Sequence, residues 1–176
     1  MFTRVEDPDD PRLVDYRELR EAGYRPDARR FIAESAYVVE RLLQSAYPVK
    51  SVLGTASHLQ RLAPVLAGRP EVAVYCAEQP VIAAAVGANF HRGVAACGLR
   101  PPGLVWTGGA EATWEWTELT RRPGFVGVLV QRLSDPANVG AILRAARAFA
   151  VDLVLLDRLG ADPLSRRAIR ASAGNV

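Results

Sequence analysis

The sequence predicts an α/β protein built from two units, and three observations lead to this fold class. Short apolar runs alternate with amphipathic segments over residues 28–99, which is typical of helices packed on a sheet. Residues 126–156 read as strand, loop, helix and strand. Residues 100–119 are rich in proline, glycine and tryptophan, which indicates a linker. The predicted boundaries are 1–100 for the first unit, 101–120 for the linker and 121–176 for the second unit.

The first unit is expected to form a small α/β/α sandwich. Its first element is a helix over 28–45, because Phe31, Val38 and Leu42 fall largely on one helical face. The later elements follow from apolar runs bounded by glycine or proline, and Pro64 is expected to open the second part of its helix. In chain order they are a strand at 49–55, a helix at 56–68, a strand at 71–77, a short helix at 79–88 and a closing strand at 91–99.

The second unit contains the run DPANVGAILRAARAF at 135–149. Asn138 belongs to the residue types that cap helix starts, and Gly140 allows another backbone to approach closely. Strands at 126–130 and 151–156 flank the helix, so the three form a right-handed βαβ unit whose first loop lines the functional edge of a parallel sheet. The helix is predicted because apolar residues recur at steps of three and four, namely Val139, Ile142, Leu143, Ala146, Phe149 and Ala150, with Arg144 and Arg147 on the other side.

The spacing of this run resembles the first signature motif of the SpoU/TrmH family of RNA ribose methyltransferases. The resemblance implies the first part of a trefoil-knotted α/β domain, which forms a homodimer, binds S-adenosylmethionine and methylates a ribose 2′-hydroxyl of structured RNA, expected to be ribosomal. The family's later motifs imply that the knot, the last strands and the donor-binding segments lie beyond Val176, so that these 176 residues are inactive alone. The matching residues are Asp135, Pro136, Asn138, Gly140, Arg144 and Phe149, followed by Ile169, Arg170, Ala171, Ser172, Ala173 and Gly174.

Asn138 and Arg144 match the asparagine and the arginine of that motif, which the resemblance implies are catalytic. An asparagine amide offers a donor and an acceptor to a ribose edge. An arginine keeps its proton, so its expected role is to bind the flanking phosphate and to stabilise developing alkoxide charge. Taken singly, Asn138 is more simply a helix cap, and Arg144 with Arg147 a solvated helix face. The joint pattern favours catalysis for Asn138 and Arg144, while Arg147 is expected to contact RNA.

The first unit resembles, more loosely, the ribosomal-protein-like RNA-binding domain that often precedes the methyltransferase domain in this family. Relatives commonly have a Glu-Gly pair where this chain has Glu34-Ser35. Residues at the ends of predicted elements could reach a phosphate or a splayed base, although each could equally be an ordinary exposed polar group. The expected RNA contacts are Arg29, Arg30, Lys50, His58 and Arg92.

The charge distribution separates the two units. Residues 1–120 carry 13 basic and 15 acidic side chains, whereas residues 121–176 carry nine arginines and four aspartates. Such a local excess of arginine suits phosphate binding. A general bias toward arginine is the alternative, because Lys50 is the only lysine of the chain.

Composition bounds the remaining possibilities. The chain is 49% hydrophobic and 23% charged, which is typical of a globular protein with a buried core. Cys76 and Cys97 lie in apolar runs and are expected to be buried free thiols, with neither a disulfide framework nor a metal site. Asp7, Asp9 and Asp10 stand where a secretory leader would be basic and then apolar. No apolar run reaches membrane length, so the cytoplasm is expected, with no membrane partner.

Two classes of function follow. The first is an S-adenosylmethionine-dependent RNA 2′-O-methyltransferase. The alternative is a non-catalytic RNA-binding protein that retains the recognition domain. A nucleotide-binding oxidoreductase is disfavoured, because the loop after the strand at 126–130 lacks the GxGxxG pattern. The tryptophans of the linker, Trp106, Trp114 and Trp116, are expected to dock between the units or to stack on RNA bases.

Overall fold

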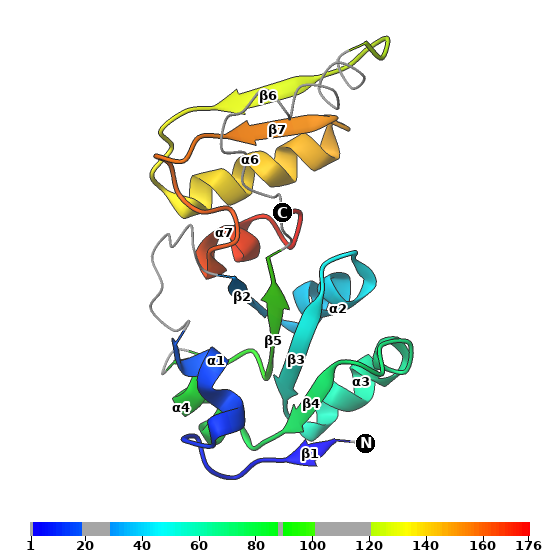
Figure 1. The fold of residues 1–176 in the computed structure, drawn as a ribbon, viewed down its shortest axis with the longest axis vertical. Coiled ribbons are helices and arrows are strands. Elements are labelled where there is room, and N and C mark those ends of the chain that lie inside the picture. The colour runs from blue at the N-terminus through cyan, green and yellow to red at the C-terminus, as the bar shows by residue number, and fades with distance from the viewer. Residues whose placement is uncertain (1, 19–28, 88–89, 101–120) are drawn as a thin grey trace.

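The computed structural model describes residues 2–18, 29–87, 90–100 and 121–176, and its largest feature is a five-stranded mixed sheet (Figure 1). β3 and β4 pair in parallel, as do β1 and β4, whereas β5 runs antiparallel to both β3 and β2. β3 is therefore the central strand, and β2 forms one edge. In the spatial order β1-β4-β3-β5-β2, the strands comprise β1 (Thr3–Arg4), β4 (Ala73–Cys76), β3 (Val49–Gly54), β5 (Val94–Leu99) and β2 (Arg30–Glu34).

Helices cover both faces of this sheet, each over its own apolar cluster. Helices α2 (Ala36–Gln44) and α3 (Ala56–Leu66) contribute to one cluster, which we call the first core. Helices α1 (Val14–Glu18) and α4 (Gln79–Val86) contribute to the other, the second core. The α/β class predicted from the alternation of apolar runs is thus confirmed.

The segment predicted as one helix over 28–45 is a strand followed by a helix, so the prediction is wrong for its first part. In β2, Phe31 and Ala33 belong to the first core and Ile32 to the second. Because both faces of the sheet are covered, the strand is a continuous apolar run, and such a run is not distinguished from helix by periodicity. Ser35 then turns the chain with a φ of 82°, and α2 begins at Ala36.

The other five elements predicted for the first unit are present, whereas the sequence did not indicate β1 and α1. The strands at 49–55, 71–77 and 91–99 correspond to β3, β4 and β5, and the helices at 56–68 and 79–88 correspond to α3 and α4. Pro64 differs from expectation, because it lies inside α3 and the helix continues through it to Leu66.

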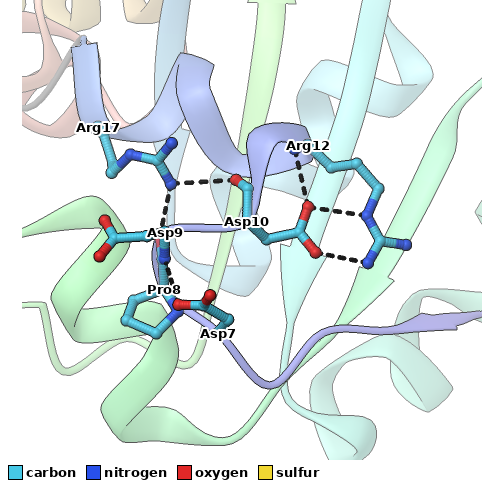
Figure 2. A network of polar contacts seen from close by, with 6 residues as sticks. All are labelled: Asp7, Pro8, Asp9, Asp10, Arg12 and Arg17. Carbon is cyan, nitrogen blue, oxygen red and sulfur yellow. Dashed lines mark hydrogen bonds and ion pairs between the residues drawn. The ribbon is translucent and has the colours of Figure 1, made fainter.

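The residues before α1 form a turn held by carboxylates and arginines (Figure 2). Asp10 accepts the backbone N–H of Arg12 at 2.9 Å, and its carboxylate also pairs with the Arg12 guanidinium at 2.6 Å. These hydrogen bonds from Arg12 lower the pKa of Asp10 to about 2. Arg17 donates to the carbonyl oxygens of Pro8 at 2.6 Å and of Asp10 at 3.1 Å. The turn thereby connects the edge strand β1 to α1 through the 3-10 helix Pro11–Leu13.

The second unit has the βαβ arrangement that the sequence predicts. Strands β6 (Gly127–Val130) and β7 (Leu153–Leu156) pair in parallel and are joined by α6 (Pro136–Ala148). Val139 and Ala146 are buried, whereas Leu129 of β6 is 74% exposed. Phe149, predicted on the buried stripe of the helix, is 81% exposed, because α6 ends at Ala148 and Phe149 takes a non-helical conformation.

Helix α7 (Arg166–Ala171) joins the two units. It packs against both α6 and β2, and Figure 1 shows it between the βαβ unit and the five-stranded sheet. Leu164 and Ile169 belong to the first core, together with residues of β2, β3 and α2. Residues that the sequence assigns to the unit 121–176 thus complete the core of the preceding sheet. The linker predicted at 101–120, with its three tryptophans, lies outside the described residues.

Candidate functional site

The start of α6 carries the polar residues of the DPxNxG run. Asp135 is the N-cap, since its Oδ1 accepts the backbone N–H of Ala137 at 2.9 Å, and Pro136 takes the first helical position, where a proline costs no hydrogen bond. Asn138, whose residue type also suits a helix cap, lies instead within the first turn of the helix and is exposed. Because Asp135 already provides the cap, the Asn138 amide is not used for capping.

Arg144 and Arg147 lie further along α6 and are exposed, as their spacing predicts. Within the described ranges neither of them forms an ion pair. Because α6 follows the carboxyl end of β6, Asn138 lies near the edge of the sheet where parallel α/β folds bind ligands. One helix therefore presents an amide and two guanidinium groups to the solvent.

Gly140 sets how closely α6 approaches α7. A Cβ atom at this position would lie 2.7 Å from the Ala171 Cβ and 2.9 Å from the backbone nitrogen of Ser172, and closer still to the Ala168 carbonyl oxygen. These distances are too short for any side chain without a shift of the α7 backbone. The close approach expected at Gly140 is confirmed, and the two segments that carry the family resemblance touch each other here.

Asp157 directly follows β7 and holds the loop that leads toward α6. Its Oδ2 accepts the backbone N–H of Arg132 at 2.8 Å, and Arg132 has a left-handed φ of 52°. Its Oδ1 is buried and has no hydrogen-bond partner among the residues that the structure describes. The loops after β6 and β7 are thus fastened together. Sequence reasoning missed Asp157, although a carboxylate directly after a predicted strand is a signal that could have found it.

The five residues expected to contact RNA in the first unit lie at opposite ends of the sheet. The strand register places Arg29, Arg30 and Lys50 at the end where β3 begins. It places His58 and Arg92 at the end where β3 leads into α3. The structure therefore brings His58 and Arg92 together and separates them from the other three.

Arg30 and Lys50 are both paired with a buried carboxylate. Asp15 of α1 is 1% exposed and forms ion pairs with the Lys50 Nζ at 2.6 Å and with the Arg30 guanidinium. Arg30 also reaches a carboxylate oxygen of Glu18 at 3.1 Å. A buried carboxylate needs such partners, so both cations stabilise the position of α1, and a phosphate would compete with Asp15 for them. Arg29, beside them, is exposed.

His58 and Arg92 flank a tight backbone contact. The His58 Nδ1 lies 2.8 Å from the Thr55 Oγ1, and the His58 ring covers Gly93 so closely that a Cβ there would overlap it. Gly93 also has a φ of 68°, a conformation that favours glycine. Arg92 is exposed, and the described part of the chain offers its guanidinium no ion-pair partner. Of the five residues, Arg92 combines an available charge with a neighbouring aromatic ring.

Both cysteines are free thiols. Cys97 is fully buried, and burial raises its pKa to about 11, so it is a neutral thiol near neutral pH; Cys76 is half-buried. Among the described residues, no three histidine, cysteine or carboxylate side chains are grouped so that they could hold a metal ion. No helix in the described ranges has both the length and the apolar character needed to cross a membrane.

The fold and the α6 surface define an α/β protein with two sheets. Helix α6, which carries the exposed arginines, follows the parallel strand β6. Helix α7 packs α6 against the five-stranded sheet. Residues 126–176 match the SpoU rRNA Methylase family. The match begins just before β6 and therefore includes Asn138, Arg144 and α7.

Relatives and solved structures extend the likeness to the first unit. An uncharacterised tRNA/rRNA methyltransferase of Mycobacterium tuberculosis is 36% identical over 175 residues, which cover 97% of this chain and 56% of that protein. The AdoMet-bound rRNA methyltransferase from Sinorhizobium meliloti has a TM-score of 0.76 at 21% identity, over 99% of this chain and 61% of that one. An RNA 2′-O ribose methyltransferase has a TM-score of 0.69 at 24% identity, over 98% of this chain and 62% of that one. The two structures establish the fold, and the chain spans about half the length of the curated relatives it matches.

Proposed function

We propose that this chain is part of an S-adenosylmethionine-dependent methyltransferase that modifies a ribose 2′-hydroxyl of structured RNA, with ribosomal RNA as the substrate. The observation that carries the proposal is the exposure of Asn138 and Arg144 on one helix after a parallel strand, within a segment that matches the SpoU rRNA Methylase family. The first unit would hold the RNA, and the second would act on the ribose.

Asn138 and Arg144 would act directly on the ribose. The amide of Asn138 can donate and accept a hydrogen bond, so it would orient the hydroxyl group for attack on the methyl group. Arg144 keeps its proton, so it would bind the flanking phosphate and stabilise the negative charge that develops on the 2′-oxygen as the hydroxyl proton passes to solvent water. Arg147, on the next turn, would contact a neighbouring phosphate.

The methyl donor supplies an electrophilic methyl group when it is bound. A cavity of about 50 Å³ lies between α2 and α7, with Leu42 and Ile169 in its lining, and Asn138 does not line it. Ligand pockets commonly measure roughly 300 Å³ or more, so this cavity does not fit a nucleoside donor. We therefore do not assign this cavity to the donor, and we assign no described residue to donor binding.

RNA recognition would centre on Arg92 and His58. Their end of the sheet offers an exposed guanidinium beside an imidazole, which suits a phosphate next to an unstacked base. Arg29, Arg30 and Lys50 would form a second contact region at the opposite end. The pairing of Arg30 and Lys50 with Asp15 would weaken that contact.

We further propose that the complete protein is a cytoplasmic homodimer. The exposure of Leu129 on β6 and of Phe149 after α6 supports a further protein surface over the second unit, since exposed apolar surface often marks an interaction site. Light scattering from the complete protein would give twice the mass of one chain.

Replacing Arg144 by alanine tests the catalytic assignment. In the complete protein to which these residues belong, Arg144→Ala should lower the single-turnover rate of 2′-O-methylation by about 100-fold or more, the usual effect of losing a group that stabilises transition-state charge. Arg61→Ala is the matched control, because Arg61 is an equally exposed helical arginine on α3. A rate within twofold of wild type for Arg144→Ala would remove this residue from the mechanism.

The second candidate is a non-catalytic RNA-binding protein, and the exposed Arg92 beside the His58 ring would serve that function equally well. The same experiment separates the two functions, if RNA binding is measured beside methyl transfer. Tight RNA binding by the complete wild-type protein, with no methyl group transferred from labelled donor, would support the second candidate and refute the first.

A further inference from the structure

Arg166, the first residue of α7, contacts the first unit through two different groups. Its guanidinium forms an ion pair with the Glu34 carboxylate and donates a hydrogen bond to the Val86 carbonyl oxygen at 2.8 Å. The Glu34 side chain is 9% exposed and the Arg166 side chain 26% exposed. Low exposure strengthens charged hydrogen bonds, and the planar guanidinium can serve two acceptors at fixed angles.

The two acceptors belong to elements that end near the proposed RNA-recognition residues. Glu34 is the last residue of β2 and Val86 the last residue of α4. Glu34 pairs with Ala95 near the start of β5, which is the end of the sheet that carries Arg92. Arg166 therefore fixes α7 to two elements at that same end.

A second group of contacts keeps α7 from pivoting about Arg166. Asp162 and Arg100 form an ion pair at 2.6 Å in which both side chains are under 10% exposed. Between the two polar contacts, Leu164 enters the first core, and Ile169 does so one turn after Arg166. Arg41 of α2 holds the Asn175 side chain at 2.7 Å beyond the helix.

The contact at Gly140 ties the position of α6, the proposed catalytic helix, to that of α7. Because α7 backbone atoms lie too near Gly140 to admit a Cβ, a displacement of α7 would move α6 or open a gap between the helices. Asn138 lies two residues before Gly140 and Arg144 four residues after it. The chain of contacts thus runs from Arg92's end of the sheet through Arg166 and α7 to Asn138 and Arg144.

We propose that Arg166 is a positioning residue, which sets the angle between the RNA-recognition unit and helix α6 so that RNA held by the first unit presents its ribose to Asn138 and Arg144. This inference rests on the function proposed above. Arg166 does not touch substrate in this scheme. It acts by keeping two separate RNA contacts in one geometry, and a displacement on the order of 1 Å at a reacting group can cost about 100-fold in rate.

Distances between spin labels test the positioning directly. Labels are placed at the exposed positions Glu40 of α2 and Ala148 of α6 by Glu40→Cys and Ala148→Cys, with half-buried Cys76 replaced by alanine; buried Cys97 is retained. The parent protein should give one narrow distance distribution. Arg166→Gln should broaden it at least twofold or shift it, whereas Arg170→Gln, an exposed arginine of the same helix, should leave it unchanged.

Kinetics distinguish positioning from a loss of folded protein. At saturating RNA, Arg166→Gln in the complete protein should lower the single-turnover rate constant about tenfold while the Kd for RNA changes less than threefold. Partial unfolding would reduce the amplitude of the reaction and leave its rate constant intact. Arg166→Lys keeps the charge but offers no planar fork for two acceptors, so its rate and distance width should lie between those of wild type and Arg166→Gln.

Wild-type distances and rates in Arg166→Gln would overturn the inference. If Arg166→Gln does not fold, Arg166→Lys decides the question, because a wild-type distance width in that variant would also overturn it. The distances are measured without methyl transfer, so they still decide the positioning role if the complete protein proves inactive. An inactive wild-type protein with a broadened Arg166→Gln distribution would refute the proposed function and leave the positioning of α6 standing.

Discussion

Ser35 occupies a backbone conformation that L residues rarely adopt, with φ 82° and ψ 148°. This region of φ and ψ is used almost entirely by glycine and costs another residue about 1–3 kcal/mol. Glycine is the residue that the family resemblance leads one to expect here, after Glu34. The serine hydroxyl offsets part of this strain energy, because it accepts a hydrogen bond from the backbone N–H of Val38 at the long distance of 3.4 Å.

We predict that Ser35→Gly raises the free energy of unfolding by about 1 kcal/mol. The gain comes from relief of the strained φ, and the loss of the capping hydroxyl subtracts only a few tenths, because glycine is nearly as good an N-cap. Urea denaturation followed by circular dichroism measures the change. Ser35→Ala is the control, since it removes the hydroxyl and keeps the strain, and it should lower stability by about 1 kcal/mol. Equal stabilities for the glycine and alanine variants would contradict the strain argument.

At the same scale, the sequence predicts which residues are exposed better than it predicts their partners. Arg144 and Arg147 are exposed because their helical spacing is local. The pairing of Lys50 with Asp15 is not local, because it requires α1 to lie across the start of β3. Arg166 and Glu34 are separated by 132 residues, so no period in the sequence brings them together. The sequence therefore predicts Lys50 as an RNA contact and does not point to Arg166.

At the scale of the element, whether a helix or strand is predicted correctly depends on whether one or both of its faces are buried. The βαβ unit is predicted correctly, because α6 has one buried stripe and its strands are bounded by polar loops. The strand β2 is missed, because it contributes to both cores and its apolar run merges with that of α2. A glycine at position 35 would have marked the boundary between them.

The N-cap of α6 offers a test at this scale. Asp135→Ala should lower the free energy of unfolding by about 1 kcal/mol, because the first turn loses the acceptor for the Ala137 N–H. Methyl transfer by the complete protein should also fall, since Asn138 lies in that turn. Asp135→Asn keeps a capping oxygen and should remain within about 0.5 kcal/mol of wild type.

The asparagine variant also removes the ion pair of Asp135 with Arg167, whose atoms are 3.6 Å apart and whose side chains are largely exposed. Exposed pairs of this kind contribute little. If Asp135→Asn is as destabilised as Asp135→Ala in urea, the ion pair and not the cap holds the start of the helix.

At the scale of the whole molecule, the two units are not independent bodies joined by a linker. Leu164 and Ile169 come from the segment that matches the SpoU rRNA Methylase family, yet they complete the core beneath α2 and α3. The buried pair of Arg100 and Asp162 crosses the same junction. A division of the chain by sequence at residues 101–120 therefore follows composition, whereas the packing crosses that division.

Because the core is shared, we predict that a destabilising substitution in α7 also destabilises the five-stranded sheet. Ile169→Ala removes a side chain that is 2% exposed, and such truncations cost about 2–5 kcal/mol because they leave a cavity. If the units unfold together, the backbone amides of Val52 in β3 and Ala96 in β5 should lose that same free energy of protection in hydrogen exchange. Leu159→Ala is the control, because Leu159 is 71% exposed and its loss should change protection by less than about 0.5 kcal/mol. Loss of protection confined to α6 and α7, with β3 and β5 unchanged, would show that the first sheet folds without α7, and the coupling inferred from the shared core would then be wrong.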